Sequence, residues 1–375
     1  MRIVSVEAIP LDARLKAPFK FGRIVRTRSS NVLVKLLTDE GLVGWGEACP
    51  VPQLTGETRE SIVSVVNERV APIVIGRDPS SWRPLMDDAA AQLQGCPATR
   101  AAIETAVLDL VGRARGMSVA ELLGGRYREE IELHGSVGWE EDPDKMADAA
   151  VSQAERYRAL KLYVGRADLK SDLGRLAAAR KAVGGDHPFI VDINGLWTSS
   201  QALAAGQALA EAGVTVLEQP VRRTDAVGAA EVTRVLGERF TIQVAADESI
   251  LGVDDAVHIA RDRTAHLANV GMTKLGGPAA AHDVAAVAAA VHLPVLVGSV
   301  VELGIATAAG LQLAAALPEL SLPAYLGGAA KYVRQVTSPL VADDRGFMRV
   351  PSGPGLGIEV DEEAVRDLDL RSAIG

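Results

Sequence analysis

Three acidic residues end three consecutive apolar segments in the second half of the chain. They are Asp192 in Phe-Ile-Val-Asp-Ile-Asn-Gly, Glu218 in Val-Leu-Glu-Gln-Pro and Asp247 in Ala-Ala-Asp-Glu-Ser. Each acid alone could equally cap the following helix, but three in succession, one of them a glutamate, favour a shared site. Three carboxylates brought together repel one another unless a cation joins them. All-oxygen ligation suits Mg²⁺, or Mn²⁺ in its place, so the pattern predicts a metal site.

A possible base lies at the end of an earlier apolar segment, in Lys161-Leu-Tyr163. Residues two apart on a strand share a face, so both side chains should point to the same side of the sheet. The neighbouring ammonium and the metal are expected to lower the pKa of Tyr163, which would make its phenolate a base. The alternative is that Tyr163 fills space and hydrogen-bonds a metal ligand.

Short apolar runs alternate with Ala-rich helical patterns after Gly124-Gly125, which predicts a (β/α) barrel. The strand candidates are 131–136, 160–164, 188–192, 214–218, 241–247, 266–270, 294–298 and, least clearly, 322–326. The helix candidates include 169–182, 199–212, 253–261, 278–291 and 305–317. A doubly wound sheet would usually carry a Gly-rich phosphate loop, and the sequence shows none. Because barrel enzymes keep working residues at the carboxyl ends of strands, the three acids should converge at one mouth.

The first part of the chain differs from the barrel in its pattern. Alternating runs near residues 3–6 and 31–36 predict an antiparallel sheet with a hairpin, and helical periodicity follows at 61–70, 81–93 and 97–113. We therefore predict an α+β domain over residues 1–125 and a barrel over 126–330. The remaining segment, 331–375, contains a Gly/Pro-rich turn and is predicted to return to the amino-terminal domain.

Composition narrows the class of protein. The net charge of −9 and the lack of a basic run argue against a nucleic-acid partner. No run approaches the roughly 20 apolar residues of a membrane span, and the amino terminus lacks the apolar core of a signal peptide. Cys49 and Cys96 are far apart and are expected to be reduced thiols. We expect a cytoplasmic protein with no membrane partner.

Taken in order, several motifs resemble those of the muconate lactonizing enzyme / mandelate racemase-like proteins of the enolase superfamily. Within these proteins, the resemblance is to the muconate-lactonizing-enzyme subgroup. The motifs are Lys161-x-Tyr163, Asp192-x-Asn194, Glu218-Gln-Pro, Asp247-Glu-Ser, Lys274-Leu-Gly-Gly, and, outside the barrel, Gly44-Trp-Gly-Glu-Ala, Thr55-Gly-Glu, Ala106-Val-Leu-Asp-Leu and Pro354-Gly-Leu-Gly. The resemblance spans the chain and implies a (β/α)₇β TIM-like barrel beneath an α+β capping domain. It also implies that the three acids bind Mg²⁺, that a substrate carboxylate binds the metal, and that a base takes the adjacent proton to give an enediolate.

The chain departs from that subgroup at both usual catalytic lysines. The base position on the second strand is Tyr163, and the position five residues before the Gly-Gly pair on the sixth strand is Gly271. Lys274 matches another lysine of the family, whose role is either catalytic or structural. We count Tyr163, Lys161 and Lys274 as the catalytic candidates.

The resemblance also indicates which residues should contact the substrate. One capping-domain loop supplies Phe21, Arg23 and Arg26, and a second, over residues 51–57, supplies Leu54. The two arginines either hold a second anionic group of the substrate or are solvated loop charges. Barrel-mouth positions supply Trp139, Asn194 and Glu302. Strand eight lacks the paired aspartates of dipeptide epimerases, so a dipeptide substrate is disfavoured.

Three functions remain open from the sequence. With one acid–base group, the protein would be a syn lyase (dehydratase) or a cycloisomerase of a small carboxylate. A racemase or epimerase of an amino-acid derivative or hydroxy acid would need a second group, for which Lys331 is a possible source. The third is a metal-binding barrel without catalysis. In each case we expect a homo-oligomer, since symmetric assembly is common.

Overall fold

Parallel strands form the wall of a barrel in the second part of the chain, which the computed structural model describes over residues 1–185 and 187–371. Neighbouring strands pair in the order β13-β12-β11-β10-β9-β8-β7, all parallel. They are β7 (Gly135–Val137), β8 (Leu160–Tyr163), β9 (Phe189–Asp192), β10 (Val214–Glu218), β11 (Gln243–Ala246), β12 (Leu267–Asn269) and β13 (Val295–Leu296). The second to seventh predicted strands are confirmed in place, most of them shorter than predicted. The first, predicted over 131–136, is wrong in its bounds, because residues 130–132 form β6, which pairs with β14 (Phe347–Arg349), and the barrel strand begins at Gly135.

The eighth predicted strand closes the barrel through a few backbone hydrogen bonds instead of a regular ladder. On one side, Ala324 N donates to Glu132 O at 2.8 Å and His134 N donates to Ala324 O at 3.1 Å. On the other side, Tyr325 N donates to Val297 O at 2.9 Å. This segment therefore lies between the first and seventh strands, and the predicted (β/α)₇β barrel is confirmed.

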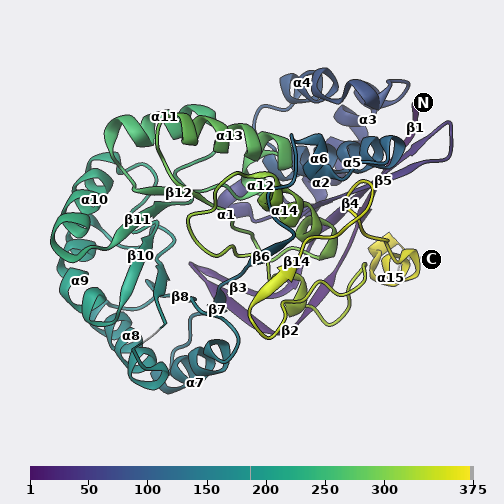
Figure 1. The fold of residues 1–375 in the computed structure, drawn as a ribbon. Coiled ribbons are helices and arrows are strands. Elements are labelled where there is room, and N and C mark those ends of the chain that lie inside the picture. Colours follow the sequence, from purple (N-terminus) through teal and green to yellow (C-terminus); the bar gives the residue numbers. More distant parts are fainter. Residues whose placement is uncertain (186, 372–375) are drawn as a thin grey trace.

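Helices surround the strands in an arc (Figure 1). They are α7 (Pro143–Ala154), α8 (Leu169–Val183), α9 (Ser199–Glu211), α10 (Ala226–Phe240), α11 (Val253–Asp262), α12 (Met272–Leu275), α13 (Pro278–Ala290) and α14 (Gly304–Ala316). Side-chain caps begin several of them: Asp168 accepts from Ser171 N, and Thr198 forms a capping box with Gln201. Over the described residues, no helix is both long and apolar enough to cross a membrane.

An α+β region precedes the barrel. Its sheet has the order β1-β4-β5, and β2 and β3 form a separate antiparallel hairpin. The elements are β1 (Ile3–Pro10), β2 (Ala13–Phe21), β3 (Ile24–Ser29), β4 (Val32–Thr38), β5 (Val43–Ala48), α1 (Pro52–Thr55), α2 (Arg59–Val65), the π-helical turn η1 (Val66–Val70), α3 (Ala71–Val74), η2 (Pro79–Ser81), α4 (Trp82–Gln92), α5 (Pro97–Arg115) and α6 (Val119–Leu122). Gly46 lets α5 lie directly on β5, because a Cβ there would be 1.8 Å from Ala102 O.

The carboxyl-terminal segment packs back onto this α+β region. It contains η3 (Ala329–Lys331), β14 (Phe347–Arg349), which pairs with β6 (Glu130–Glu132), and α15 (Glu362–Leu368). Leu356 N donates to Asp109 Oδ1 at 2.9 Å, and Val119 N donates to Gly355 O at 2.8 Å. These contacts agree with the expected return of the chain, while the division at residues 125 and 330 stays a prediction.

Two buried glutamates of the α+β region cap helices of the barrel. Glu47 accepts from Leu303 N at 2.7 Å and from Ala306 N at 2.9 Å, at the start of α14. Glu104 accepts from Ala279 N at 2.7 Å, at the start of α13. Burial raises the pKa of each glutamate to about 7, although the helix amides favour the charged form. The two parts of the molecule are thus joined by carboxylates at helix N-termini.

Replacing Glu104 with glutamine should make stability less dependent on pH. The folded-state pKa of about 7 exceeds the ordinary 4.5, so the native state binds an extra proton between these values. This stabilisation is full below about pH 4.5 and is lost as the pH rises through 7. Between pH 5 and pH 8 the wild type should lose on the order of 2 kcal/mol of unfolding free energy relative to the variant. Urea unfolding at both pH values measures this, and parallel profiles would contradict it.

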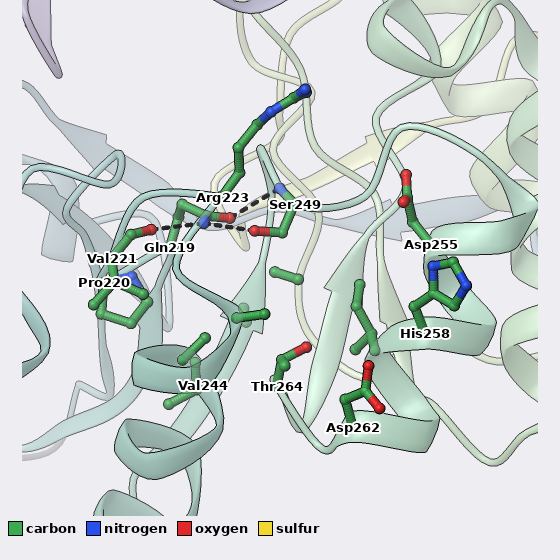
Figure 2. Close-up of a pocket in the computed structure, with 15 residues that line it drawn as sticks. Gln219, Pro220, Val221, Arg223, Val244, Ser249, Asp255, His258, Asp262 and Thr264 are labelled. Carbon is green, nitrogen blue, oxygen red and sulfur yellow. Dashed lines mark hydrogen bonds between the residues drawn. The ribbon is translucent and has the colours of Figure 1, made fainter.

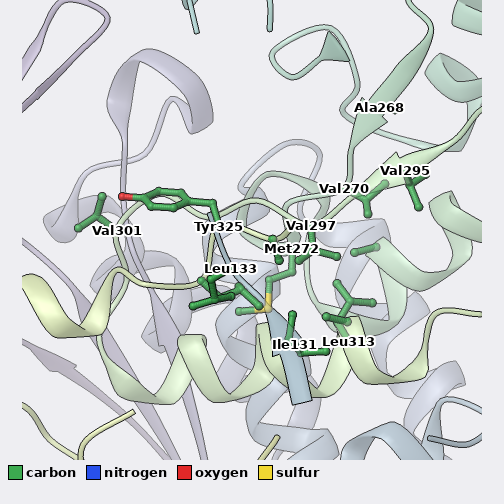
Figure 3. Packing of buried hydrophobic residues seen from close by; sticks show 14 of the residues in the cluster. Ile131, Leu133, Ala268, Val270, Met272, Val295, Val297, Val301, Leu313 and Tyr325 are labelled. Atoms are coloured by element: carbon green, nitrogen blue, oxygen red, sulfur yellow. The ribbon is translucent and has the colours of Figure 1, made fainter. Parts of the chain in front are cut away.

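The apolar core continues from the barrel interior to α14 (Figure 3). Leu133, Met272 and Leu313 belong to one buried cluster that extends to Tyr325 and Val301. Figure 3 shows Tyr325 beside Val301 at one end of this group. Both of these residues also line the cavity described next, so the packed core fixes part of its wall.

Candidate active site

Asp192, Glu218 and Asp247 meet at the carboxyl ends of β9, β10 and β11. One carboxylate oxygen from each lies within 4.8 Å of the others. The strand register places Asp192 directly beside Glu218. Both of these side chains are buried, whereas Asp247 is half-buried. The three predicted ligands therefore form one cluster, which could hold a metal ion.

Lys161 supplies positive charge inside this three-carboxylate cluster. Its Nζ lies 2.8 Å from Asp192 Oδ2 and 2.8 Å from Glu218 Oε2. Burial lowers the pKa of Lys161, but the two carboxylates raise it well above its ordinary value. Burial raises the pKa of Asp192, and although Lys161 lowers it, Glu218 and Asp247 raise it further. The carboxylate oxygens of the three acids lie close enough together to bind one cation, and two of the acids already contact the Lys161 ammonium. Such a set of oxygen ligands fits a hard divalent cation such as Mg²⁺.

Lys274 and Gln219 hold the third acid in place. Lys274 Nζ donates to Asp247 Oδ1 and to its carbonyl oxygen, each at 2.5 Å. Gln219 Oε1 accepts from Asp247 N at 3.0 Å. It also accepts from Ser249 N at 3.1 Å, while its Nε2 donates to Val221 O and Ser249 Oγ (Figure 2). These contacts give Lys274 a role in positioning Asp247, and Lys274 does not line the cavity.

A cavity of about 290 Å³ opens over the cluster. Eight of the predicted site residues lie in its wall: Phe21, Arg23, Leu54, Lys161, Tyr163, Asp192, Asn194 and Asp247. The other lining residues are Phe19, Gly22, Ile24, Val51, Gln53, Leu196, Glu248, Asn269, Ser299, Val300, Val301 and Tyr325. The strand ends form a polar floor, whereas the β2–β3 hairpin and α1 contribute a largely apolar outer wall.

Tyr163 ends β8 and packs against the hairpin. Its ring lies edge to face with Phe19, with centroids 5.6 Å apart, and 6.1 Å from the ring of Phe21. Lys161 Nζ lies 5.2 Å from the Tyr163 centroid. Burial raises the pKa of Tyr163 well above its ordinary value, and Lys161 opposes only part of this. Lys161 does lower the pKa of Tyr163, but burial beside the phenylalanine rings raises it more. The predicted net lowering is therefore wrong for the effect of the protein's residues alone.

Arg26 lies behind the cavity wall instead of in it. Its buried guanidinium donates to Val300 O at 2.6 Å and to Pro50 O at 3.3 Å. The next residue of that loop, Val301, has a φ of +67°, which is uncommon for a β-branched residue. Its carbonyl accepts from Tyr332 Oη at 2.6 Å. Arg26 and Tyr332 together hold the backbone of this part of the wall.

Replacing Arg26 with methionine should lower the unfolding free energy by about 1–3 kcal/mol, because the carbonyls of Val300 and Pro50 lose a charged donor. Mg²⁺ affinity should stay unchanged, since within the described residues Arg26 forms no ion pair with the three acids. Urea unfolding and calorimetric titration with Mg²⁺ measure the two effects. Unchanged stability with weaker substrate binding would instead support the predicted substrate contact.

Trp139 and Glu302 also lie outside the cavity wall. The guanidinium carbons of Arg166 and Arg175 lie 5.1 and 5.0 Å from the Trp139 ring centroid. Glu302 accepts from Thr273 Oγ1 and from Val300 N, each at 3.0 Å. Both side chains thus contact other residues of the protein, although Trp139 Nε1 has no hydrogen-bond partner among the described residues.

Five polar residues of the cavity were not among the predicted site residues: Gln53, Glu248, Asn269, Ser299 and Tyr325. Burial raises the pKa of Glu248 well above its ordinary range and that of Tyr325 to about 12. The Tyr325 hydroxyl lies 3.3 Å from Ser136 Oγ. Glu248, Asn269, Ser299 and Tyr325 could have been found from their position, because each lies at the carboxyl end of a predicted barrel strand or within one residue of it.

Gly271 leaves the end of β12 without an ionisable side chain, four strands along the sheet from Tyr163. Lys331, the alternative source of a second acid–base group, places its Nζ 4.3 Å from the centroid of Phe19 and does not line the cavity. Burial lowers the pKa of Lys331 to about 8. Of the two positions that usually carry catalytic lysines, only the one on β8 therefore bears an acid–base side chain, Tyr163, while Glu248 after β11 is a further ionisable group of the cavity.

Comparison with known proteins places both parts of the chain in described families. Residues 4–124 match the family mandelate racemase / muconate lactonizing enzyme, N-terminal domain, and residues 145–364 match enolase C-terminal domain-like. The chain is 32% identical to muconate cycloisomerase 1-1 of Acinetobacter lwoffii, over 97% of this chain and 95% of that protein. It is 29% identical to N-succinyl-L-Arg/Lys racemase of Bacillus cereus, over 99% and 98%.

The fold gives the same result. The crystal structure of muconate lactonizing enzyme from Pseudomonas fluorescens complexed with muconolactone superposes with a TM-score of 0.93 at 30% identity, covering 98% of this chain and 99% of that one. Proteins named for two different reactions thus resemble this chain over nearly its whole length.

Proposed function

Because the chain belongs to the mandelate racemase / muconate lactonizing enzyme family of the enolase superfamily, we propose that it is a Mg²⁺-dependent lyase or cycloisomerase of a small carboxylate. The observation that carries the proposal is the asymmetry of the cavity. Tyr163 and Lys161 stand beside the three-carboxylate cluster on β8, whereas Gly271 stands at the end of β12. An acid–base group at only one of these two positions suits a reaction completed on a single face of the substrate.

Each residue has a distinct part in this proposal. Asp192, Glu218 and Asp247 would hold the cation, with Asp247 positioned by Lys274. When bound there, Mg²⁺ supplies positive charge that stabilises the negative charge developing on the substrate carboxylate. Tyr163 takes the proton from the carbon beside that carboxylate. Because burial raises its pKa, the charge of Lys161 is needed to favour the phenolate.

A racemase or epimerase is the alternative, and Tyr325 is the observation that favours it. This second phenol lines the same cavity, and a relative is named as a racemase. The Tyr325 segment lies between the strands next to β8 and those next to β12, so its backbone favours neither side. Its hydroxyl lies 3.3 Å from Ser136 Oγ on β7, the strand that pairs with β8, and this contact supports single-face chemistry over inversion.

Proton exchange in D₂O tests the proposal directly. The protein with Mg²⁺ is incubated with a panel of small carboxylic acids, and the proton beside the carboxylate is followed by NMR. We expect exchange or turnover that depends on Mg²⁺ and retains configuration. Exchange with inversion would replace the lyase or cycloisomerase proposal with the racemase. Binding of acids without exchange or turnover would contradict the proposed chemistry.

A further inference from the structure

Asp172 is a buried carboxylate that lies outside the cavity wall. It belongs to the first turn of α8 and is 0% exposed. Its Oδ2 accepts a hydrogen bond from Gly165 N at 2.9 Å. Gly165 is two residues beyond Tyr163, in the loop that follows β8. The carboxylate therefore bonds to the backbone immediately after the proposed base.

The end of β8 is paired further on one side than on the other. The register of β7 and β8 ends at Val137 and Leu162, one residue before Tyr163. On the other side, β9 continues: Tyr163 is paired with Asp192, and Val164 N donates to Asp192 O at 3.1 Å. Beyond the end of the β7 ladder, the backbone after Tyr163 is therefore held by β9 and by the carboxylate from α8.

The loop after β8 contacts two parts of the molecule that shape the cavity. Gly165 has a φ of +104°, which favours glycine, and a Cβ there would lie 3.2 Å from Ile193 O and from Leu196 Cβ. The next residue, Arg166, donates from Nη1 to Ile24 O at 3.1 Å, in the β2–β3 hairpin. Leu196 and Ile24 both line the cavity. The bond to Gly165 N thus fixes a loop that lies against the loop after β9 and against the hairpin.

Arg175, one turn further along α8, holds the neighbouring loop in the same way. Its Nε donates to Glu140 O and its Nη2 donates to Glu141 O, each at 2.7 Å, in the loop after β7. Its Nη1 lies 3.8 Å from Asp172 Oδ1, and both side chains are buried. Two adjacent side chains of α8 therefore hold the loops after β7 and β8, where the ladder between these strands has ended.

Stabilisation of α8 alone does not explain the placement of Asp172. The helix already has an N-cap, because Asp168 accepts from Ser171 N at 3.0 Å and from Ser171 Oγ at 2.6 Å. Asp172 instead turns its Oδ2 out of the helix, toward Gly165. A carboxylate that served only the helix would not need this contact.

We propose that Asp172 is a positioning residue for Tyr163: by holding the loop after β8, it keeps the phenol at the place in the cavity from which the proton is taken. The effect on the reaction rests on the proposed function, whereas the effect on the phenol's position does not. Misplacement of a reacting group by about 1 Å costs on the order of 10²-fold in rate. Loss of the bond to Gly165 should therefore lower kcat, and KM should change little because Asp172 does not line the cavity.

Carbon-13 NMR of protein labelled at tyrosine Cζ tests the position of the phenol without any substrate. The chain has 5 tyrosines, and the Tyr163→Phe variant identifies the resonance of Tyr163. Asp172→Ala should move this resonance by more than its linewidth and leave that of Tyr127, which is 63% exposed, unchanged. Asp172→Asn keeps an oxygen that accepts from Gly165 N, so it should restore the wild-type resonance. An unmoved Tyr163 resonance in Asp172→Ala would overturn the inference.

Proton exchange in D₂O with Mg²⁺ measures the effect on the reaction. The probes are 3-phenylpropanoate, 3-phenyllactate and mandelate, whose rings suit the apolar wall at Phe21 and Leu54. Asp172→Ala should lower kcat about 10-fold or more with KM nearly unchanged, and Asp172→Asn should recover most of the loss. If no probe exchanges in the wild type while the Tyr163 resonance moves as expected, the proposed function fails and the positioning role stands.

Asp168→Ala is the matched control, because it removes the N-cap of the same helix without touching Gly165. It should change neither the Tyr163 resonance nor kcat. Equal changes in Asp168→Ala and Asp172→Ala would mean that Asp172 only stabilises α8, which would overturn the inference. If Asp172→Ala does not fold, Asp172→Ser takes its place, since a serine hydroxyl is too short to reach Gly165 N.

Discussion

Glu218→Gln is expected to abolish Mg²⁺ binding at millimolar concentrations and to reduce proton exchange by at least about 10³-fold. The reason is that the cluster loses the negative charge of one of the three carboxylates that would hold the cation. Glu218 is the central acid: it lies beside Asp192 in the register, accepts from Asn269 Nδ2, and pairs with Lys161. Calorimetric titration with Mg²⁺ and NMR in D₂O measure the two losses.

A matched control for this variant is available on α10. Glu238 pairs with Arg234 on the exposed face of that helix, at 2.9 Å. Glu238→Gln makes the same chemical change and should alter neither Mg²⁺ affinity nor exchange, since exposed pairs contribute little. If Glu218→Gln bound Mg²⁺ as well as Glu238→Gln, the three-carboxylate cluster would not be the metal site.

Tyr163→Phe should lower the exchange rate by about 10²–10⁴-fold, the range for loss of a general base. The ring would keep its packing against Phe19 and Phe21, so the fold and the Kd for Mg²⁺ should change little. Because burial raises the pKa of Tyr163, the wild-type rate should still increase with pH above neutrality. The variant should lose this dependence along with the activity.

Tyr325→Phe is the control, because it removes a second phenol from the same cavity. The Tyr325 hydroxyl contacts Ser136 and lies on a different strand, so this variant should retain most of the exchange activity. Equal losses in the two variants would mean that both phenols act, which would favour the racemase. Full activity in Tyr163→Phe would remove Tyr163 from the mechanism.

The carboxylate cluster was predictable because it depends on local pattern alone. An apolar run that stops at an acid identifies a strand end, and the barrel rule brings the ends of successive strands to one mouth. The same rule placed Tyr163 and Asn194 correctly in the cavity wall. No knowledge of distant contacts was needed for these residues.

Residues whose roles depend on distant contacts were not predictable in this way. Arg26 resembles a loop cation in the sequence, yet it is buried against the carbonyl of Val300, 274 residues away. The pKa of Tyr163 depends on burial beneath a hairpin that begins 150 residues earlier, at Ala13, as 163 − 13 = 150. Asn269 resembles an ordinary strand-end residue in the sequence. Only the structure shows that Gly298 makes room for its amide, since a Cβ at 298 would lie 2.4 Å from the Asn269 side chain.

Glu47 and Glu104 hydrogen-bond the α+β region to the N-termini of α14 and α13, and so they fix the position of this region relative to the barrel. The β2–β3 hairpin and α1 form the apolar outer wall of the cavity, while the strand ends carry the charged floor. Substitutions in the hairpin can therefore change the shape of the accepted acid without altering the charges that act on its carboxylate. The substrate preference of such a protein can therefore be redesigned in the β2–β3 hairpin and α1 while the charged strand ends are left unchanged.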